Sequence, residues 1–373
     1  MKIIFVANTS WYLYNFRKPL IVELLNLGYK VYTISPEDSY TKKLINLGVL
    51  TNNISIARSG LSPIKDVSLL IRLVKLYANI KPDIIHHFTV KPVIYGSYAS
   101  RSLKNSKIIN SIPGLGIVFS GFPITRLLVI FLYRLAISKK HQIIFQNPDD
   151  LKKFLDFKIV TMEQSSLIMS SGVDTEYFRP NAIVKNRSQI KFGLMARLLW
   201  SKGISEFVKA GHLLHKINNN TEFIILGNPD KDSLDSVSYE WLNKINESYT
   251  YIHWREHVDD VKSFLNEIDV FVLPSYYPEG VPKSLIEAAS MKLPIITTKT
   301  PGCKEVVADW VNGILVPAKD IKALSIAMQT MAYDEKRRFE MGVNSRNIAK
   351  TKFSIEKVNK KTRYLYFNKN IER

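Results

Sequence analysis

Two glutamates mark a segment whose residue types suit a phosphorylated sugar. Glu279 lies in a polar loop after the apolar run 270–274, and Glu287 lies inside a helical pattern that starts near Pro282. Proline suits the first turn of a helix, where its missing N–H costs no hydrogen bond. The free N–H groups of a helix start bind anions such as phosphate, whereas a carboxylate beside them suits hydroxyl groups. A sugar or ribose phosphate offers both groups; the alternative is an ordinary loop residue and an exposed helical one.

Two cations form a second candidate group. Arg197 and Lys202 connect the apolar run 190–195 to a helical pattern that ends near Ala210. Arginine offers a planar fork of donors and lysine a point charge, and together they suit a diphosphate. The alternative is a pair of solvated surface cations.

Short apolar runs alternate with longer helical patterns, which favours parallel sheets covered by helices. The alternation occurs twice, around a polar segment at 181–188. We therefore predict an α/β protein with two doubly wound, Rossmann-like domains, residues 1–180 and 181–350, facing across a cleft that holds the ligands. The runs expected as strands are 2–8, 29–35, 83–87, 107–112 and 142–146 in the first series, and 190–195, 222–227, 250–254, 270–274 and 294–298 in the second.

The 373-residue chain is strongly basic, with 52 Lys+Arg against 33 Asp+Glu and a net charge of +19. Residues 1–180 carry +12, and no acidic residue lies between Asp83 and Asp149. This charge calls for a polyanionic partner: nucleic acid, an anionic membrane or a phosphorylated substrate. The single cysteine, Cys303, excludes an intramolecular disulfide and a cysteine-based zinc cluster and favours a reducing compartment.

The amino-terminal residues lack the pattern of a signal peptide, so we expect a cytoplasmic protein. The strongly apolar run 127–133 is too short to span a bilayer, which needs about 20 residues. The segment 127–140, LLVIFLYRLAISKK, has two interpretations. It is either a buried helix of the first domain or a basic amphipathic helix on an anionic membrane surface.

The two residue groups together resemble the retaining family 4 glycosyltransferases of the GT-B fold. The family's paired glutamates match Glu279 and Glu287, and its Arg and Lys pair matches Arg197 and Lys202. The segments 171–180, 301–305 and 312–317 resemble further landmarks of the family, so the resemblance covers essentially the whole chain. Ala196 and Pro282 stand where the family often has glycine.

The resemblance implies a role for each matched residue. Arg197 and Lys202 would bind the donor diphosphate and stabilise it as it leaves, Glu279 would hold a donor-sugar hydroxyl, and Glu287 the ribose hydroxyls. The backbone N–H groups of Gly280, Val281 and Lys283 would complete the donor site. Arg255 and Val258 of the 253–258 loop would join them there. The tail 351–373 would form a helix that crosses back to the first domain.

Segments 8–20, 84–92, 112–121 and 196–203 resemble enzymes that extend polyprenyl-diphosphate-linked sugars for bacterial O-antigen or capsule. This subgroup implies a UDP-linked hexose or N-acetylhexosamine as donor, with GDP as the alternative nucleotide. It also implies a lipid-linked saccharide acceptor and a peripheral position on the inner, anionic face of the plasma membrane. The candidates for acceptor contacts are Arg17, Lys91, Gly114 and Gly116, the cations for phosphate and the glycines for close backbone approach.

The sequence has no clear Asp-x-Asp motif, and we expect no metal and no cofactor. The anomeric configuration of the sugar would be retained because the acceptor attacks the sugar on the same face that the diphosphate leaves. A phosphate oxygen would take the acceptor's proton. Adjacent strand residues face opposite ways, so only one of His86 and His87 can point to the site, and we expect structural histidines. Two alternatives remain: a sugar-nucleotide epimerase of the same fold, and a basic nucleic-acid-binding protein, although no familiar nucleic-acid module is visible.

Overall fold

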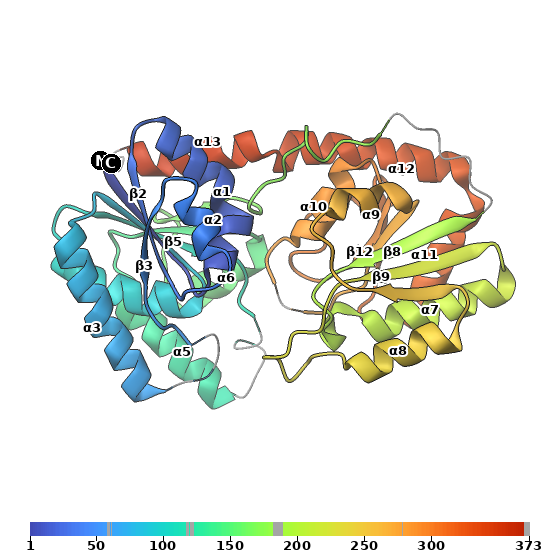
Figure 1. The fold of residues 1–373 in the computed structure, drawn as a ribbon, viewed down its shortest axis with the longest axis horizontal. Helices are drawn as coiled ribbons and strands as arrows, with labels where there is room; N and C mark the ends of the chain where they lie inside the picture. The colour runs from blue at the N-terminus through green and yellow to red at the C-terminus, as the bar shows by residue number, and fades with distance from the viewer. Residues whose placement is uncertain are drawn as a thin grey trace. The chain divides into compact units, whose positions relative to one another are not determined.

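The computed structural model describes residues 1–57, 60, 62–116, 119, 123–181, 189–277 and 279–368. The chain divides into two compact units, Met1–Ser171 with Ile355–Arg373, and Gly172–Ser354. Each unit contains one parallel sheet flanked by helices (Figure 1). The two doubly wound α/β domains predicted from the alternating pattern are therefore confirmed.

The sheet of the first unit has seven parallel strands in the order β3-β2-β1-β4-β5-β6-β7. All five runs predicted as strands are found. The sheet also contains two short polar strands, β3 and β7, which the sequence did not predict because neither contains an apolar run. The strands are β1 Lys2–Val6, β2 Lys30–Ser35, β3 Leu50–Asn53, β4 Ile84–Phe88, β5 Lys107–Ile112, β6 Gln142–Phe145 and β7 Ser165–Leu167.

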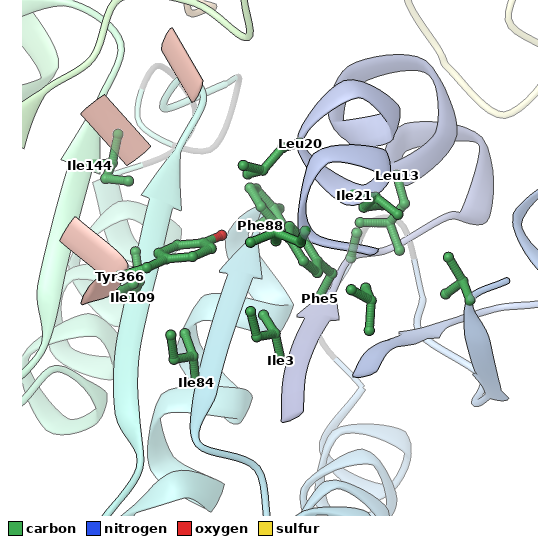
Figure 2. Close-up of a cluster of buried hydrophobic side chains, with 14 of the residues drawn as sticks. Ile3, Phe5, Leu13, Leu20, Ile21, Ile84, Phe88, Ile109, Ile144 and Tyr366 are labelled. Carbon is green, nitrogen blue, oxygen red and sulfur yellow. The ribbon is translucent and has the colours of Figure 1, made fainter. Parts of the chain in front are cut away.

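Alternate residues of the central strands build cores on both faces of this sheet. Ile3 and Phe5 pack in one cluster with Phe88 and residues of α1 (Ser10–Asn26) and α13 (Ile355–Phe367), among them Tyr366 (Figure 2). Ile4 packs in the opposite cluster with residues of α3. The two-residue period of a strand produces this division. The helices of the unit are α1 Ser10–Asn26, α2 Thr41–Ile45, α3 Pro63–Ile80, α4 Ser97–Ala99, α5 Pro123–Ala136, α6 Pro148–Asp156 and α13 Ile355–Phe367.

Helix α13 belongs to the first unit by its contacts. The Tyr366 hydroxyl lies 2.6 Å from His86 Nδ1, and Asn359 donates to Glu23 at 2.9 Å. Arg363 pairs with Glu23 at 2.9 Å. The carboxyl-terminal tail therefore covers α1 and β4.

The boundaries between the units differ from those predicted at 180 and 350. Residues 172–180 are held by the second unit, because Arg346 donates to the carbonyl oxygens of Thr175 and Phe178 at 3.0 and 2.9 Å. Ser290 donates to the Phe178 carbonyl at 2.6 Å. The first division therefore falls after Ser171 and the second after Ser354. Of the polar segment 181–188, residues 182–188 lie outside the described residues.

The sheet of the second unit has six parallel strands in the order β10-β9-β8-β11-β12-β13. All five predicted strands are found, with β13 in addition. The strands are β8 Ile190–Met195, β9 Thr221–Leu226, β10 Ile252–Arg255, β11 Val270–Leu273, β12 Ile295–Thr298 and β13 Gly313–Val316. The helices are α7 Ile204–Ile217, α8 Tyr239–Ser248, α9 Val261–Glu267, α10 Lys283–Ser290, α11 Ile321–Tyr333 and α12 Glu335–Ile348.

Within the described residues, no helix combines the length and the apolar character that a bilayer crossing requires. Helix α5, which covers most of segment 127–140, is buried on one side only. Val129, Ile130 and Tyr133 pack into the core, whereas Leu127 and Phe131 are exposed. The interpretation as a buried helix therefore holds for one face only, and contact of the exposed face with a membrane stays a prediction.

Candidate functional site

The loop after β8 and the loop after β11 lie against each other at the carboxyl edge of the second sheet. Lys202 ends a 3₁₀ turn, Trp200–Lys202, and Gly203 follows it with φ +79°. A Cβ on Gly203 would lie well within 3.0 Å of the Pro274 carbonyl oxygen. Because β8 and β11 are neighbours, this close approach joins the two segments that the sequence singled out.

Lys202 and Glu279 form an ion pair across this contact. The Lys202 ammonium, which is almost fully buried, donates to Glu279 Oε1. The Ser275 hydroxyl donates to the same oxygen at 3.4 Å, and the Tyr277 ring centroid lies 5.0 Å from the ammonium. The structure thus brings together one residue from each predicted group.

The 301–305 segment supports the backbone beside Glu279. Gly302 has φ +87°, and a Cβ there would lie well within 3.0 Å of the Gly280 carbonyl oxygen. Gly280 and Val281 are both buried. The backbone that carries Glu279 is therefore packed from both sides, by Gly203 at Pro274 and by Gly302 at Gly280.

Helix α10 starts at Lys283, with Pro282 as its N-cap rather than in its first turn. Glu287 is buried in this helix, so the alternative of an exposed helical residue is wrong. Burial raises the pKa of Glu287 to about 7, against the opposing charge of Lys283, whose ammonium lies 3.7 Å from Oε1. Glu287 therefore changes charge near neutral pH.

The remaining donor-site candidates lie at or just beyond the carboxyl ends of β8 and β10. Arg197 is half-exposed and donates to Asp230 at 2.7 Å. Arg255 donates to both carboxylate oxygens of Glu267 in α9, at 2.7 and 3.0 Å, and Val258 is exposed. Arg255 is the last residue of the outer strand β10 and Val258 follows it, with β9 and β8 between this strand and β11. Their predicted place in the donor site stays a prediction.

Arg17 is a buried cation at the carboxyl end of β4. Its guanidinium lies 4.4 Å from the Phe88 ring centroid and donates to the Tyr12 hydroxyl at 3.2 Å. Its Nε is buried and has no hydrogen-bond partner in the part of the chain that the structure describes. Among the residues that the structure describes, no carboxylate pairs with Arg17. This cation therefore lies in the first unit with hydrogen-bonding capacity to spare.

The other acceptor candidates differ from Arg17. Lys91 pairs with Asp66 at 2.7 Å, and both side chains are almost fully buried, so Lys91 already has a structural partner. Gly114 and Gly116 follow β5, and a Cβ on Gly116 would meet open space although φ is +62°. The roles predicted for these three residues at an acceptor stay predictions.

Both histidines of β4 are structural, as expected. His86 contacts Tyr366 and Ser111 at 2.6 and 2.7 Å, and His87 contacts Tyr77 and Asn110, both at 2.8 Å. Burial lowers the pKa of His86 well below its usual value, and the charge of Arg17 lowers it further. Burial lowers the pKa of His87 to about 3. Both rings are neutral at physiological pH.

Sequence reasoning missed the partners that orient the cations. Ser275 and Tyr277 lie in the same short segment as Glu279, so that segment already contained the signal. Asp230 follows β9, and a carboxylate just beyond the carboxyl end of a parallel strand is itself a signal for a site. Among the described residues, no three His, Cys, Asp or Glu side chains are grouped to hold a metal ion.

Two family models match the chain and divide it nearly as the structure does. Residues 2–147 match the model described as glycosyl transferase 4-like, and residues 176–348 match glycosyl transferases group 1. Both candidate groups of the second unit fall inside the second match.

Two curated relatives are similar over most of their length. The N,N'-diacetylbacillosaminyl-diphospho-undecaprenol alpha-1,3-N-acetylgalactosaminyltransferase of Campylobacter jejuni is 27% identical over 360 residues, which cover 92% of this chain and 93% of the relative. The UDP-Gal:alpha-D-GlcNAc-diphosphoundecaprenol alpha-1,3-galactosyltransferase of Escherichia coli is 27% identical over 325 residues, covering 83% and 81%.

Solved structures share the fold. A glycosyltransferase from Rickettsia africae has a TM-score of 0.80 at 17% identity and covers 99% of both chains. Anabaena HepE in complex with UDP-glucose also has a TM-score of 0.80 at 17% identity and covers 98% of this chain and 99% of its own.

Proposed function

The chain belongs to the glycosyltransferases of the GT-B fold, and we propose that it is a retaining, metal-independent enzyme of surface polysaccharide synthesis. It transfers a hexose or N-acetylhexosamine from a UDP-sugar to a saccharide linked to polyprenyl diphosphate. Both curated relatives are named for diphospho-undecaprenol substrates, and the name of the second specifies UDP-galactose.

The observation that carries the proposal is the Lys202–Glu279 pair at the carboxyl ends of β8 and β11. A nucleotide-sugar donor needs a cation for its diphosphate and an acceptor of hydrogen bonds for the sugar hydroxyls next to it. Lys202 supplies the first and Glu279 the second, and their ion pair holds both groups in place. Helix α10 starts shortly after Glu279, and the buried Glu287 in this helix offers a carboxylate to the ribose hydroxyls.

The chemistry follows from charge. When the bond between sugar and diphosphate breaks, positive charge develops on the sugar and negative charge on the leaving diphosphate. Fixed cations and backbone N–H dipoles stabilise that negative charge, and such preorganised electrostatics is usually the largest catalytic contribution. Arg197, Lys202 and the start of α10 supply it here without a metal. The acceptor hydroxyl then attacks from the face that the diphosphate leaves and gives its proton to a phosphate oxygen.

The acceptor side of the proposal uses the first unit. Arg17, a buried cation that pairs with no carboxylate among the described residues, suits a phosphate of the lipid diphosphate. The excess of +12 over residues 1–180 suits an enzyme that works at the anionic inner face of the plasma membrane.

A panel of UDP- and GDP-sugars with a synthetic polyprenyl-diphosphate-sugar acceptor tests the proposal. We expect transfer from one UDP-hexose or UDP-N-acetylhexosamine, with the α-anomeric configuration retained in the product, and no loss of rate with EDTA. Inversion at the anomeric carbon would overturn the retaining mechanism. Interconversion of the sugar nucleotide without acceptor would replace the transferase by an epimerase.

A further inference from the structure

We propose that helices α3 and α5 of the first unit form one docking face for an anionic lipid bilayer. This inference deepens the proposed function by naming the surface that meets the membrane, and it rests on that proposal only for the lipid-linked acceptor. The face is the set of exposed apolar side chains on the two helices, which we call the α3/α5 face.

Helix α3 has an exposed apolar stripe over its first three turns. Its residues lie at helical spacing and are between 36% and 85% exposed: Ile64, Val67, Ile71 and Val74. The opposite side of the helix, with Leu69, Leu73 and Tyr77, fills the core. These four branched side chains face solvent rather than the core, and contiguous exposed apolar patches mark interaction sites.

Helix α5 has a second stripe of the same kind. Its members are 41% to 81% exposed: Ile124, Leu127, Leu128, Phe131 and Leu135. The inward side, with Val129, Ile130 and Tyr133, packs in the core of the unit. The helix is therefore apolar on both sides, as expected for a helix that leaves one face to a lipid phase.

The two stripes belong to one side of the first sheet. Both helices pack against the same intervening segment, Pro92–Gly96 with α4, and Figure 1 draws α3 and α5 on the same side of the sheet. The exposed Tyr98 of α4 lies on this connecting segment and is stacked by Arg101 at 4.6 Å. An aromatic side chain with an adjacent cation suits the level of lipid headgroups.

The charges on the two helices are almost exclusively positive. Lys65, Arg72 and Lys75 are exposed on α3, each directly after a member of the stripe. The one acidic residue of the two helices, Asp66, is buried and paired with Lys91. Lys139 and Lys140 are exposed just beyond α5. Apolar side chains bordered by cations match an anionic bilayer, whereas a second copy of this face would oppose like charges.

The most exposed member of each stripe lies in the first turn of its helix. Ile64 and Ile124 therefore lie at the end of the sheet where its parallel strands have their carboxyl ends. Arg17, at the end of β4, lies at this same edge. A lipid diphosphate that leaves the bilayer beside Ile64 and Ile124 therefore emerges at the edge of the unit that carries Arg17.

Flotation of the full-length protein with vesicles tests this surface without any substrate. We expect co-flotation with phosphatidylcholine vesicles that contain phosphatidylglycerol, and little with phosphatidylcholine alone. The Ile64→Ser, Ile71→Ser, Leu127→Ser, Phe131→Ser variant should lose at least tenfold in partition coefficient. A control variant with four exposed apolar side chains of the second unit changed to serine, at Leu213, Ile217, Ile326 and Val343, should bind as the unaltered protein does.

A site-specific probe makes the test independent of the quadruple variant's folding. Cys303 is buried, so an NBD label reacts selectively with a cysteine introduced by Leu127→Cys or, as the control, by Ile217→Cys. We expect a blue shift and a rise in emission with anionic vesicles at position 127 and neither at 217. No flotation at low or physiological ionic strength, or equal signals at both positions, would overturn the proposal. So would a face that self-associates in solution instead of binding vesicles.

The two proposals fail separately. The α3/α5 variant should keep its rate on a short-chain, water-soluble acceptor and lose rate only on an acceptor in vesicles. Transfer by a protein that never binds vesicles would leave the glycosyltransferase standing and remove the docking face. Vesicle binding without transfer to any acceptor would leave the docking face standing and remove the glycosyltransferase.

Discussion

The α-carbon of Gly302 lies against the carbonyl oxygen of Gly280, so close that no side chain fits between them. Gly302 also has φ +87°, a backbone conformation that disfavours any residue with a Cβ. The backbone next to Glu279 is therefore held by contact with the 301–305 segment.

The first prediction is that Gly302→Ala displaces this loop and disables the enzyme. A shift of about 1 Å in a site can cost about 10²-fold in rate, and we expect a loss of that order in kcat/KM for the donor. Gly48→Ala is the matched control, because Gly48 has φ +91° but open space around a Cβ. It should show a similar backbone strain, about 1–2 kcal/mol, in thermal unfolding, with normal kinetics. Equal kinetics for the two variants would contradict the argument.

The second prediction concerns the Lys202–Glu279 pair. Lys202→Ala and Glu279→Ala should each reduce transfer by at least about 10²-fold, since removal of one fixed transition-state contact costs that much. Lys191→Met provides the comparison: Lys191 pairs with Glu222 at 2.8 Å at the amino end of the same strand, β8, remote from the loop. That variant should keep its rate. Circular dichroism checks that all three fold, and near-normal rates for Lys202→Ala or Glu279→Ala would reject the assignment.

Most strands of both sheets could be predicted because they are apolar runs buried on both sides, although the short apolar strand β13 is not among the predicted runs. Phe5, Ile85 and Phe271 stand in such runs, and every predicted run is a strand. The two polar edge strands, LTNN at 50–53 and SSL at 165–167, could not be found this way. An edge strand takes its place from pairing with a neighbour, and its side chains carry no apolar signal.

The meeting of the two candidate loops could be predicted, whereas the ion pairs of the candidate residues could not. Parallel strands bring the loops of Lys202 and Glu279 to one edge, which follows from topology alone. The pairing of Lys91 with Asp66 depends on how α3 packs beside the segment after β4, and no local pattern encodes that distance. The burial of Glu287 has the same origin, because neighbouring elements enclose α10 almost completely.

The third prediction uses the pKa of Glu287, which burial raises to about 7. If the ribose hydroxyls need the carboxylate, the KM for the donor should rise as the pH falls through 7. Glu287→Gln should have a high KM that no longer varies with pH in this range. A wild-type KM that is constant between pH 6 and 8 would contradict this role.

The same pKa predicts an effect on stability. The folded protein binds this proton more tightly than the unfolded chain, so stability falls as the pH rises from about 4.5 to about 7. Glu287→Gln removes the cost of ionising this buried carboxyl group. Between pH 4 and pH 8, its free energy of unfolding should therefore gain about 3 kcal/mol relative to that of the wild type. Thermal melts at the two pH values measure the gain, and Glu247→Gln, at an exposed carboxylate of α8, should show none.

The last prediction separates binding from stability at Arg17. A buried cation without a carboxylate partner is expensive to desolvate, so an apolar replacement of similar size is often neutral or stabilising. Arg17→Met loses the contact with the Phe88 ring, worth about 0.5–2 kcal/mol, and the melting temperature should change by only a few degrees. The KM for a polyprenyl-diphosphate acceptor should rise about tenfold or more, because one charged hydrogen-bonding partner is lost, while the KM for the donor stays constant. Lys18→Met, at the exposed neighbour that stacks on Tyr14, should alter neither constant. Strong destabilisation of Arg17→Met with an unchanged acceptor KM would show that the guanidinium serves the fold and not the acceptor.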